Sequence, residues 1–322
     1  MSTCELPTTT ESLSGDELPN SEDYKKGVEY ITDTWPNLSK LPSEYVLPLT
    51  TNPLLVSHDS IPVIDLSGLN GSAESRMMTI QALDSACSEW GIFGVVNHGI
   101  KISVMEEMLE APAYVLQVFY LEGLYETSWA GRPLHSNSDL WPSNPSNHRN
   151  IAKEFIEEVW QLQLKIASAL SEALGLDSDY IEKSLGEGFQ IVGSNYYAPC
   201  QEPHRTLGIR EHSDHGGLTV LMQNDVDGLQ VEHDGEWVAV RIVPGSFVIN
   251  IGDYMEILSN GRYKTLKHRG VTNAQRTRIS IAVGNGPGLT STVAPASPLL
   301  DEKIEIKSKR HYKRKKSIAS HE

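Results

Sequence analysis

Cysteine is scarce in this chain, and long apolar runs are missing from it. Its 322 residues include three cysteines, Cys4, Cys87 and Cys200, which are too few and too scattered for a disulfide framework or a cysteine-rich zinc site. This usage is typical of a reducing compartment. No stretch approaches the ~20 apolar residues of a transmembrane helix, and residues 1–20 lack the basic and apolar segments of a signal peptide. We therefore expect a cytoplasmic protein that does not contact a membrane.

Positive charge is also in short supply. The chain has 27 Lys and Arg against 42 Asp and Glu, a net charge of −15, which argues against a nucleic-acid partner. The exception is residues 301–322, where eight basic residues lie between Lys303 and Lys316. We expect this basic tail to be solvated, and a nuclear address is the alternative.

The remaining chain divides by composition and periodicity. Residues 1–60 form an N-terminal arm whose Ser-, Thr- and Glu-rich beginning predicts partial disorder. Residues 61–143 contain two apolar strands and an apolar periodicity over 73–90 that predicts a helix. Ser103 and Glu106 have the spacing of a capping box at the start of a further helix. Residues 123–147 are polar and predict a loop, whereas 151–173 carry a continuous apolar stripe that predicts a long helix.

The segment 188–288 has a different character. Short runs rich in β-branched and aromatic residues, such as FQIVGSNYY, LTVLMQ and SFVINIG, are separated by turns such as Asp234-Gly235 and Asn260-Gly261. Several short strands at close spacing are typical of a sandwich or barrel. The fold class expected is α+β with a mainly β core, supported by helices on its N-terminal side.

Two histidines and one aspartate within this β segment suggest a metal site. His212 and Asp214 are two residues apart, so on a strand or at its end their side chains point the same way. His268 follows far enough along the chain to return on another strand. Two His and one carboxylate, with the remaining positions open, are the ligand set of non-haem Fe(II) oxygenases. A zinc site made of His212, Asp214 and His215 is a weaker alternative, because alternation points His215 away from the other two.

Arg278 and Ser280 begin the last apolar strand, RISIAV. An arginine at the start of a buried strand needs an anionic partner, because an unpaired buried charge is costly. Its planar fork suits a carboxylate. The three candidate metal ligands and the arginine together predict an iron enzyme with an acidic co-substrate.

At this point the chain resembles the plant-type 2-oxoglutarate- and Fe(II)-dependent dioxygenases, the family of flavanone 3-hydroxylase, flavonol synthase and anthocyanidin synthase. The stretches that carry the resemblance are IPVIDLSGL, SEWGIFGVVNHGI, LWPSNP, SNYYAPC, HSDHGGLTVLMQNDVDGLQV, FVINIGDYMEILSNGRYKTLKHRGVTN and RISIAV. The resemblance implies a double-stranded β-helix, or jelly roll. It also implies that residues 61–143 are the family's N-terminal region and 188–288 its Fe(II)/2-oxoglutarate core.

The same resemblance implies roles for single residues. His212, Asp214 and His268 resemble the iron ligands, and Arg278 and Ser280 resemble the residues that bind the distal carboxylate of 2-oxoglutarate. Asn195 and Tyr197 resemble a supporting pair near the other end of that co-substrate. The implied cofactors are Fe(2+), 2-oxoglutarate and O2, with ascorbate as reductant. No further catalytic residue is implied beyond the metal ligands.

The implied function is oxidation of a small plant metabolite, such as a flavonoid, alkaloid or hormone, with release of succinate and CO2. The reaction could be hydroxylation, desaturation or demethylation, and the enzyme is expected to act as a monomer. The stretch between Ser128 and Leu140 is shorter than in relatives, and the ending after Asp301 departs from them. Two alternatives therefore stay open: an ascorbate-dependent enzyme similar to aminocyclopropane-carboxylate oxidase, and a catalytically impaired metal-binding member.

Overall fold

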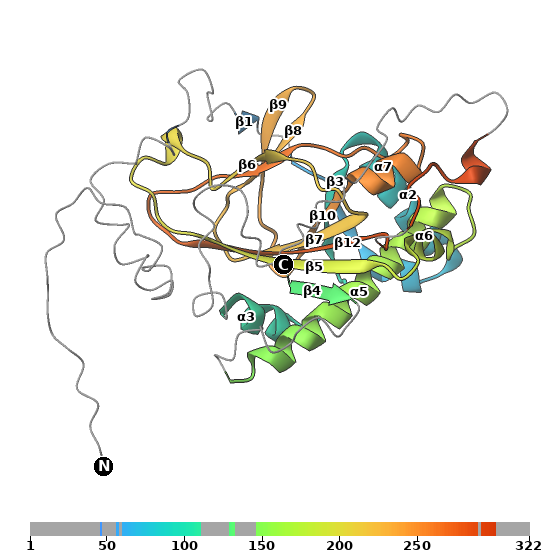
Figure 1. Cartoon of the computed structure of the whole chain (residues 1–322), viewed down its shortest axis with the longest axis horizontal. Helices are drawn as coiled ribbons and strands as arrows, with labels where there is room; N and C mark the ends of the chain where they lie inside the picture. The colour runs from blue at the N-terminus through green and yellow to red at the C-terminus, as the bar shows by residue number, and fades with distance from the viewer. Residues whose placement is uncertain are drawn as a thin grey trace, which may run out of the picture.

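Two β-sheets form the centre of the computed structural model, which describes residues 46, 56–57, 60–110, 129–132, 146–288 and 291–300. The larger sheet has, in spatial order, β2 (Val63–Asp65), β3 (Ile92–Val96), β10 (Phe247–Ile251), β7 (Leu218–Gln223), β12 (Arg278–Gly286), β5 (Phe189–Tyr197) and β4 (Trp129–Arg132). The smaller sheet has β1 (Val56–Ser57), β9 (Glu236–Val240), β8 (Leu229–His233), β11 (His268–Gly270) and β6 (Ile209–His212). Figure 1 shows the two layers facing each other.

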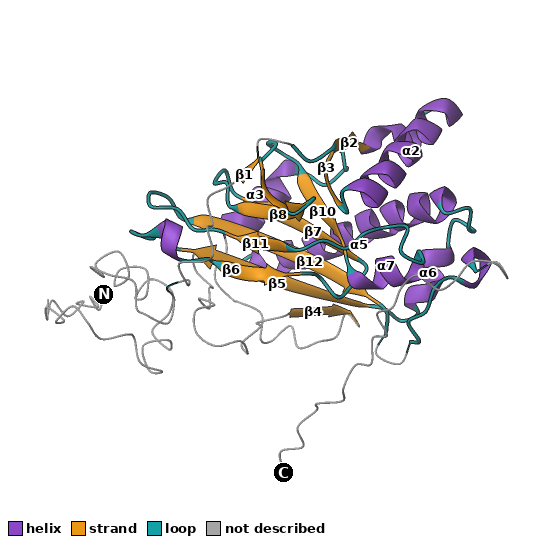
Figure 2. Ribbon diagram, turned by 90° about the horizontal axis from the view of Figure 1, so that it is seen from above, coloured by secondary structure: helices purple, strands orange, loops and turns teal. Residues whose placement is uncertain are grey.

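Helices lie mainly on one side of this double layer, as Figure 2 shows. They are α2 (Ala73–Glu89), α3 (Ile102–Glu110), α5 (His148–Ala173), α6 (Tyr180–Leu185) and α7 (Asp253–Leu258), with short 3-10 turns η4 (Leu66–Asn70), η6 (Pro203–Arg205) and η7 (Ser297–Leu299). Within the described ranges no helix is long and apolar enough to cross a bilayer.

The long helix α5 joins the helices to the larger sheet. Its buried stripe includes Phe155, which packs at a ring-centroid distance of 6.3 Å against Phe247 at the start of β10. The helix is followed by Gly175, whose φ of 74° lies in the left-handed region that a glycine adopts without strain. This helix and the sheet behind it form the main hydrophobic core.

The predicted fold class is confirmed: two sheets of mostly antiparallel strands, with helical support, make the expected jelly roll. The predicted helices over 73–90 and 151–173 are present as α2 and α5. The predictions for residues 1–45 and for the basic tail lie outside the described residues.

Two local predictions were wrong. The expected loop at 123–147 contains a strand, β4. This strand pairs with β5 and is the edge strand of the larger sheet. The expected capping box does not start a helix, because α3 begins at Ile102, before Ser103. The carbonyl oxygen of Lys101 accepts the first hydrogen bonds of this helix, from the N–H groups of Val104 and Met105. In the confirmed helix α2, Met77 is 54% exposed, so only part of the apolar residues of this helix face the core.

Candidate metal centre and co-substrate clamp

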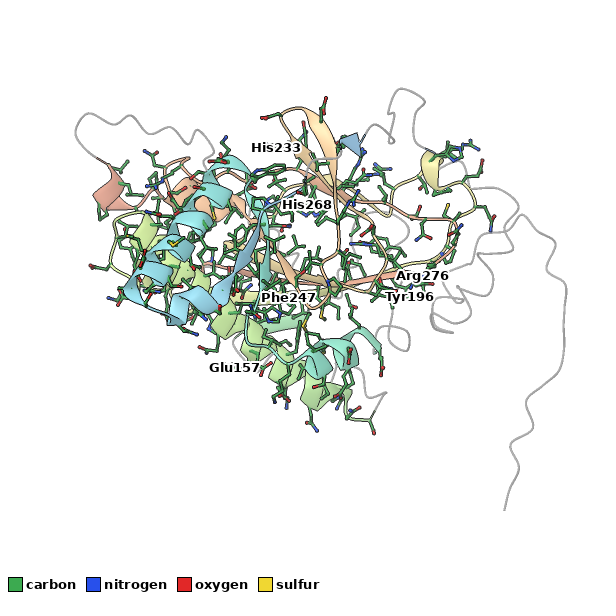
Figure 3. All side chains as sticks on the ribbon, turned by 180° about the vertical axis from the view of Figure 1, so that it is seen from behind. Glu157, Tyr196, His233, Phe247, His268 and Arg276 are labelled. Atoms are coloured by element: carbon green, nitrogen blue, oxygen red, sulfur yellow. The ribbon has the colours of Figure 1, made fainter. Side chains whose placement is uncertain are left out.

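His212 and His268 are direct cross-strand neighbours. His212 ends β6, His268 begins β11, and the two are paired in the antiparallel register of these strands. Their ring centroids are 4.3 Å apart. The sheet itself therefore brings together two imidazoles that lie far apart in the sequence, as Figure 3 indicates for His268 in the interior of the molecule.

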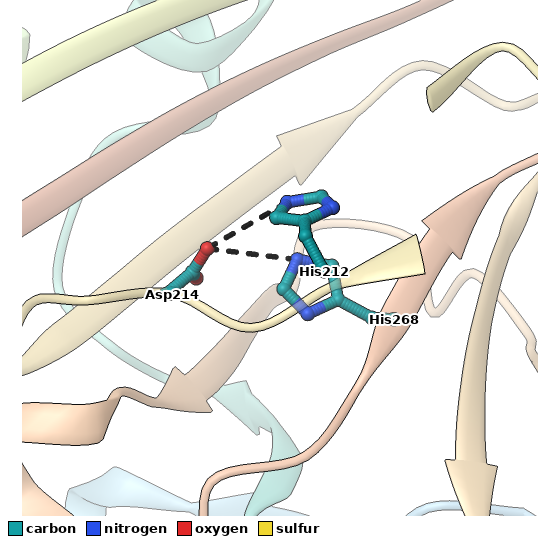
Figure 4. A group of neighbouring side chains, drawn as sticks. All are labelled: His212, Asp214 and His268. Atoms are coloured by element: carbon teal, nitrogen blue, oxygen red, sulfur yellow. Dashed lines mark ion pairs between the residues drawn. The ribbon is translucent and has the colours of Figure 1, made fainter. Parts of the chain in front are cut away.

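Asp214 completes the group from the loop after β6. Its Oδ1 lies 3.8 Å from Nε2 of His212 and 3.7 Å from Nε2 of His268 (Figure 4). The three potential ligand atoms all lie within 4.8 Å of one another. Bonds from a metal to nitrogen or oxygen are about 2.0–2.2 Å long, so one ion can touch atoms at these separations with little movement.

The surroundings of the two histidines suit metal binding. Nδ1 of His212 lies 2.8 Å from the carbonyl oxygen of Arg210, which fixes a proton on Nδ1 and leaves the Nε2 lone pair facing Asp214. Burial lowers the pKa of His268, and the charge of Asp214 and a backbone hydrogen bond at Leu266 oppose this only in part. A neutral imidazole is the state that a metal requires.

Asp214 is held at its carboxylate by a residue of β10 and at its backbone by the segment that follows β10. Nδ2 of Asn250 lies 3.5 Å from Oδ2 of Asp214, so Oδ1 is the oxygen turned toward the histidines. The N–H of Asp253 donates to the Asp214 carbonyl oxygen at 2.7 Å. A Cβ on Gly252 would come within 3.0 Å of that same carbonyl oxygen, so the close approach depends on glycine.

His215 does not belong to the metal group. Its Nδ1 lies 3.0 Å from Oδ2 of Asp253, away from the cluster formed by His212, Asp214 and His268. This is the orientation that strand alternation predicted, and it removes the zinc alternative that used His215.

A buried arginine lies on the other sheet. Arg278, at the start of β12, is 1% exposed, and so is Ser280 two residues on. Nε and Nη2 of Arg278 donate to Oε1 of Gln223 at 3.3 and 2.8 Å, while Nη1 is buried with no hydrogen-bond partner among the described residues. The guanidinium carbon lies 4.6 Å from the ring centroid of Tyr197. The arginine side chain thus contacts a neutral amide and an aromatic ring, and neither of them balances its positive charge.

Asn195 and Tyr197 pair with Ser280 and Arg278, respectively, in the register of β5 and β12. Nδ2 of Asn195 lies 3.5 Å from Oγ of Ser280. The sequence placed these two residues near the opposite end of the co-substrate, whereas the structure places them beside the arginine and the serine. Their role toward a bound co-substrate stays a prediction.

Three residues that shape the site were not predicted from the sequence. Gln223 is the polar residue that ends the apolar run LTVLM, Asn250 is the polar residue inside the apolar strand FVINI, and Gly228 lies against Arg278. Polar residues within or at the end of buried strands were the available signal, but their partners depend on strand register.

Comparison with known proteins gives a consistent result. Residues 188–287 match the family model of the 2OG-Fe(II) oxygenase superfamily, and residues 61–115 match that of the non-haem dioxygenase in morphine synthesis N-terminal region. The chain is 35% identical to Protein DMR6-LIKE OXYGENASE 1 of Arabidopsis thaliana, covering 84% of this chain and 86% of that protein. It is 37% identical to flavanone 3-dioxygenase 2 of Oryza sativa subsp. japonica, covering 81% and 84%.

Solved structures agree. The crystal structure of JOX2 in complex with 2OG, Fe and JA superposes with a TM-score of 0.74 at 30% identity, covering 85% of this chain and 86% of that one.

Proposed function

The chain belongs to the 2OG-Fe(II) oxygenase superfamily, and on that premise we propose that His212, Asp214 and His268 hold its iron, while Arg278 and Ser280 hold the distal carboxylate of 2-oxoglutarate. The protein is an oxidoreductase of the dioxygenase type that uses Fe(2+), 2-oxoglutarate and O2. The observation that carries the metal assignment is the convergence of three ligand atoms from β6, its following loop and β11.

The arginine supports the assignment of the co-substrate. A guanidinium that is 1% exposed and has an unpartnered Nη1 is unfavourable by itself, because burying a charge without a partner costs several kcal/mol. A carboxylate would supply both the missing acceptor and the missing negative charge. Ser280, two residues on and equally buried, offers a hydroxyl on the same face of β12.

The protein groups around the metal have defined tasks. Iron together with 2-oxoglutarate supplies the oxidation, in which O2 is consumed and the co-substrate becomes succinate and CO2. Asn250 donates to the Asp214 carboxylate, the N–H of Asp253 holds the Asp214 backbone through its carbonyl oxygen, and the Arg210 carbonyl oxygen lies at Nδ1 of His212, so that Nε2 is the nitrogen left for the metal. Preorganised ligands of this kind need little rearrangement when the metal binds.

For the substrate we propose a small plant metabolite such as a flavonoid, an alkaloid or a hormone, which is hydroxylated, desaturated or demethylated. The names of similar proteins support this class: flavanone 3-dioxygenase 2 at 37% identity and oxoglutarate-dependent flavonoid 7-O-demethylase 1 of Ocimum basilicum at 32%. A similar solved structure is described as a dioxygenase for auxin oxidation.

We also propose a monomer that works in the cytoplasm with ascorbate as reductant. Cys87 and Cys200 are free thiols, which suits a reducing compartment. Size-exclusion chromatography with light scattering tests the oligomeric state, and a fluorescent fusion protein tests the location in the cell.

The test of the function is incubation with Fe(II), 2-oxoglutarate, ascorbate and a panel of plant metabolites. We expect a substrate-dependent release of CO2 from labelled 2-oxoglutarate, matched by a product that has gained oxygen or lost hydrogen or methyl. Turnover that needs ascorbate but not 2-oxoglutarate would favour the alternative similar to aminocyclopropane-carboxylate oxidase. Iron binding without any 2-oxoglutarate consumption would favour the impaired alternative.

A further inference from the structure

The half-buried Gln223 and the buried Arg278 form a pair of one neutral and one charged side chain. Gln223 is the last residue of β7 and is the cross-strand partner of Ser280 on β12. One atom of its amide, Oε1, accepts from both Nε and Nη2 of Arg278, at 3.3 and 2.8 Å. A single acceptor that bridges these two nitrogens occupies one edge of the guanidinium plane.

This contact decides which edge stays free. A guanidinium has five N–H donors in a rigid fork, and the bridged edge uses one from Nε and one from Nη2. The edge that remains is formed by Nη1, which is buried without a partner among the described residues, and the second hydrogen of Nη2. The ring of Tyr197 covers one face of the plane. A carboxylate can therefore make two parallel hydrogen bonds only at the Nη1–Nη2 edge.

We propose that Gln223 is a positioning residue for the co-substrate: its neutral amide turns the free edge of Arg278 toward the carboxylate of 2-oxoglutarate and leaves the positive charge for it. A carboxylate side chain at the same position would make the same contact, but it would neutralise the arginine and compete with the co-substrate. The inference rests on the proposed role of Arg278.

A second arginine provides an internal comparison. Arg269 donates from Nε to Oε1 of Gln230 at 2.8 Å, and its guanidinium carbon lies 3.9 Å from the ring centroid of Trp237. Both Arg269 and Gln230 are buried, at 5% and 7% exposure. This group belongs to the smaller sheet and has the same three components as the Gln223 group. Its glutamine is thus a matched control for the chemistry of a Gln→Glu change.

The experiment compares Gln223→Glu, Gln223→Met and Gln230→Glu with the unmodified protein. Each is loaded anaerobically with Fe(II) and titrated with 2-oxoglutarate, and the absorbance band of the chelated 2-oxo acid gives the dissociation constant. Metal content and Tm, with and without 2-oxoglutarate, are measured on the same samples.

For Gln223→Glu we expect at least about tenfold weaker binding of 2-oxoglutarate, which is about 1.4 kcal/mol, with iron content unchanged. Its Tm without co-substrate should rise, because the buried arginine gains a charged partner, and the further rise on adding 2-oxoglutarate should shrink. A residue that only supported the fold would lower Tm and affinity together. Gln223→Met should weaken binding about fivefold through loss of the orienting bond, and Gln230→Glu should leave it unchanged.

Wild-type affinity in both Gln223 variants would overturn the proposal, and so would a joint fall of affinity, Tm and iron content in both. An equal loss in Gln230→Glu would also overturn it, because the effect would then be a general one of added charge. If Gln223→Glu fails to fold, Gln223→Met decides. Arg278→Lys separates the two levels: wild-type affinity in that variant would refute the proposed role of the arginine itself, whereas a loss there beside unaffected Gln223 variants would refute only the role of Gln223.

Discussion

Gly228 is the position where one added methyl group should act on the co-substrate site. It precedes β8 and lies against the side chain of Arg278, where a Cβ would overlap Cδ of the arginine. The same Cβ would lie 2.8 Å from Nε and 2.9 Å from the carbonyl oxygen of Val271. Gln223 holds one edge of the guanidinium and Tyr197 covers one face, so a shift of Arg278 would disturb the orientation of its free edge.

In Gly228→Ala, the size of the effect on 2-oxoglutarate binding and on Tm depends on which neighbour of the new methyl group moves. Forcing an extra methyl into a packed interior costs about 1–3 kcal/mol. If Arg278 shifts, that amount is lost from co-substrate binding, which corresponds to roughly 5- to 150-fold in the dissociation constant. If the backbone at Val271 resists and the strain stays, Tm falls by roughly 2–4 °C per kcal/mol. We expect the first outcome to dominate, because a side chain moves more readily than a backbone carbonyl group.

The assay is an anaerobic titration of the Fe(II)-loaded variant with 2-oxoglutarate, with Tm measured in parallel. Gly193→Ala on β5 is the matched control, since a Cβ there would meet no atom within 4 Å, and it should behave as the unmodified protein. Unchanged affinity and unchanged Tm in Gly228→Ala would refute the reasoning, because they would mean that Arg278 is neither confined nor needed. An equal effect in Gly193→Ala would trace the loss to the glycine replacement in general.

Three further predictions concern the metal site, the proposed co-substrate residues Arg278 and Ser280, and the stability of the fold. His212→Ala should weaken Fe(II) binding by more than the 10–100-fold typical of losing an outer partner of a ligand; full iron content after dialysis would disprove the triad. Arg278→Lys should raise the 2-oxoglutarate requirement with iron content unchanged, because an ammonium cannot offer two parallel bonds, and Ser280→Ala should do so by ~1 kcal/mol or somewhat more; initial rates at varied 2-oxoglutarate measure both. Burial raises the pKa of Tyr254 to about 12 from about 10 in an unfolded chain. Stability from this group is therefore complete below about pH 10 and decreases by about 3 kcal/mol as the pH rises to 12. Tyr254→Phe should flatten the alkaline decline in urea unfolding curves, and an identical decline would contradict the assignment.

Much of the site could be predicted because it depends on residue type and order. An imidazole and a carboxylate two residues apart, a distant second imidazole and an arginine at a strand start were enough to name His212, Asp214, His268 and Arg278. The structure adds that His212 and His268 face each other across two paired strands. The sequence signal was strong because few other functions need this ligand set in this order.

What could not be predicted depends on pairing between distant strands. Gln223 reaches Arg278 only because β7 and β12 are aligned with Gln223 opposite Ser280, and a shift by one residue would turn the amide to the other face. Tyr197 lies beside the same arginine for the corresponding reason on β5. Local patterns carry no information on such a register.

Local rules also failed where tertiary contacts outweighed them. β4 forms within a polar stretch because β5 offers a free edge, which composition does not reveal. Ser103 has capping-box spacing, but α3 begins one residue earlier, so its hydroxyl is not at the cap position. The apolar Met77 remains exposed because α2 covers the sheet with only part of its apolar residues.

The division of the site between two sheets has a mechanical consequence. The candidate metal ligands His212, Asp214 and His268 lie on or beside the smaller sheet, and Arg278 lies on the larger one. A 2-oxoglutarate molecule held at one end by the metal and at the other by Arg278 would connect the two sheets. Loading the protein would then stiffen the whole sandwich, and a protease would cut the empty form more readily than the filled one.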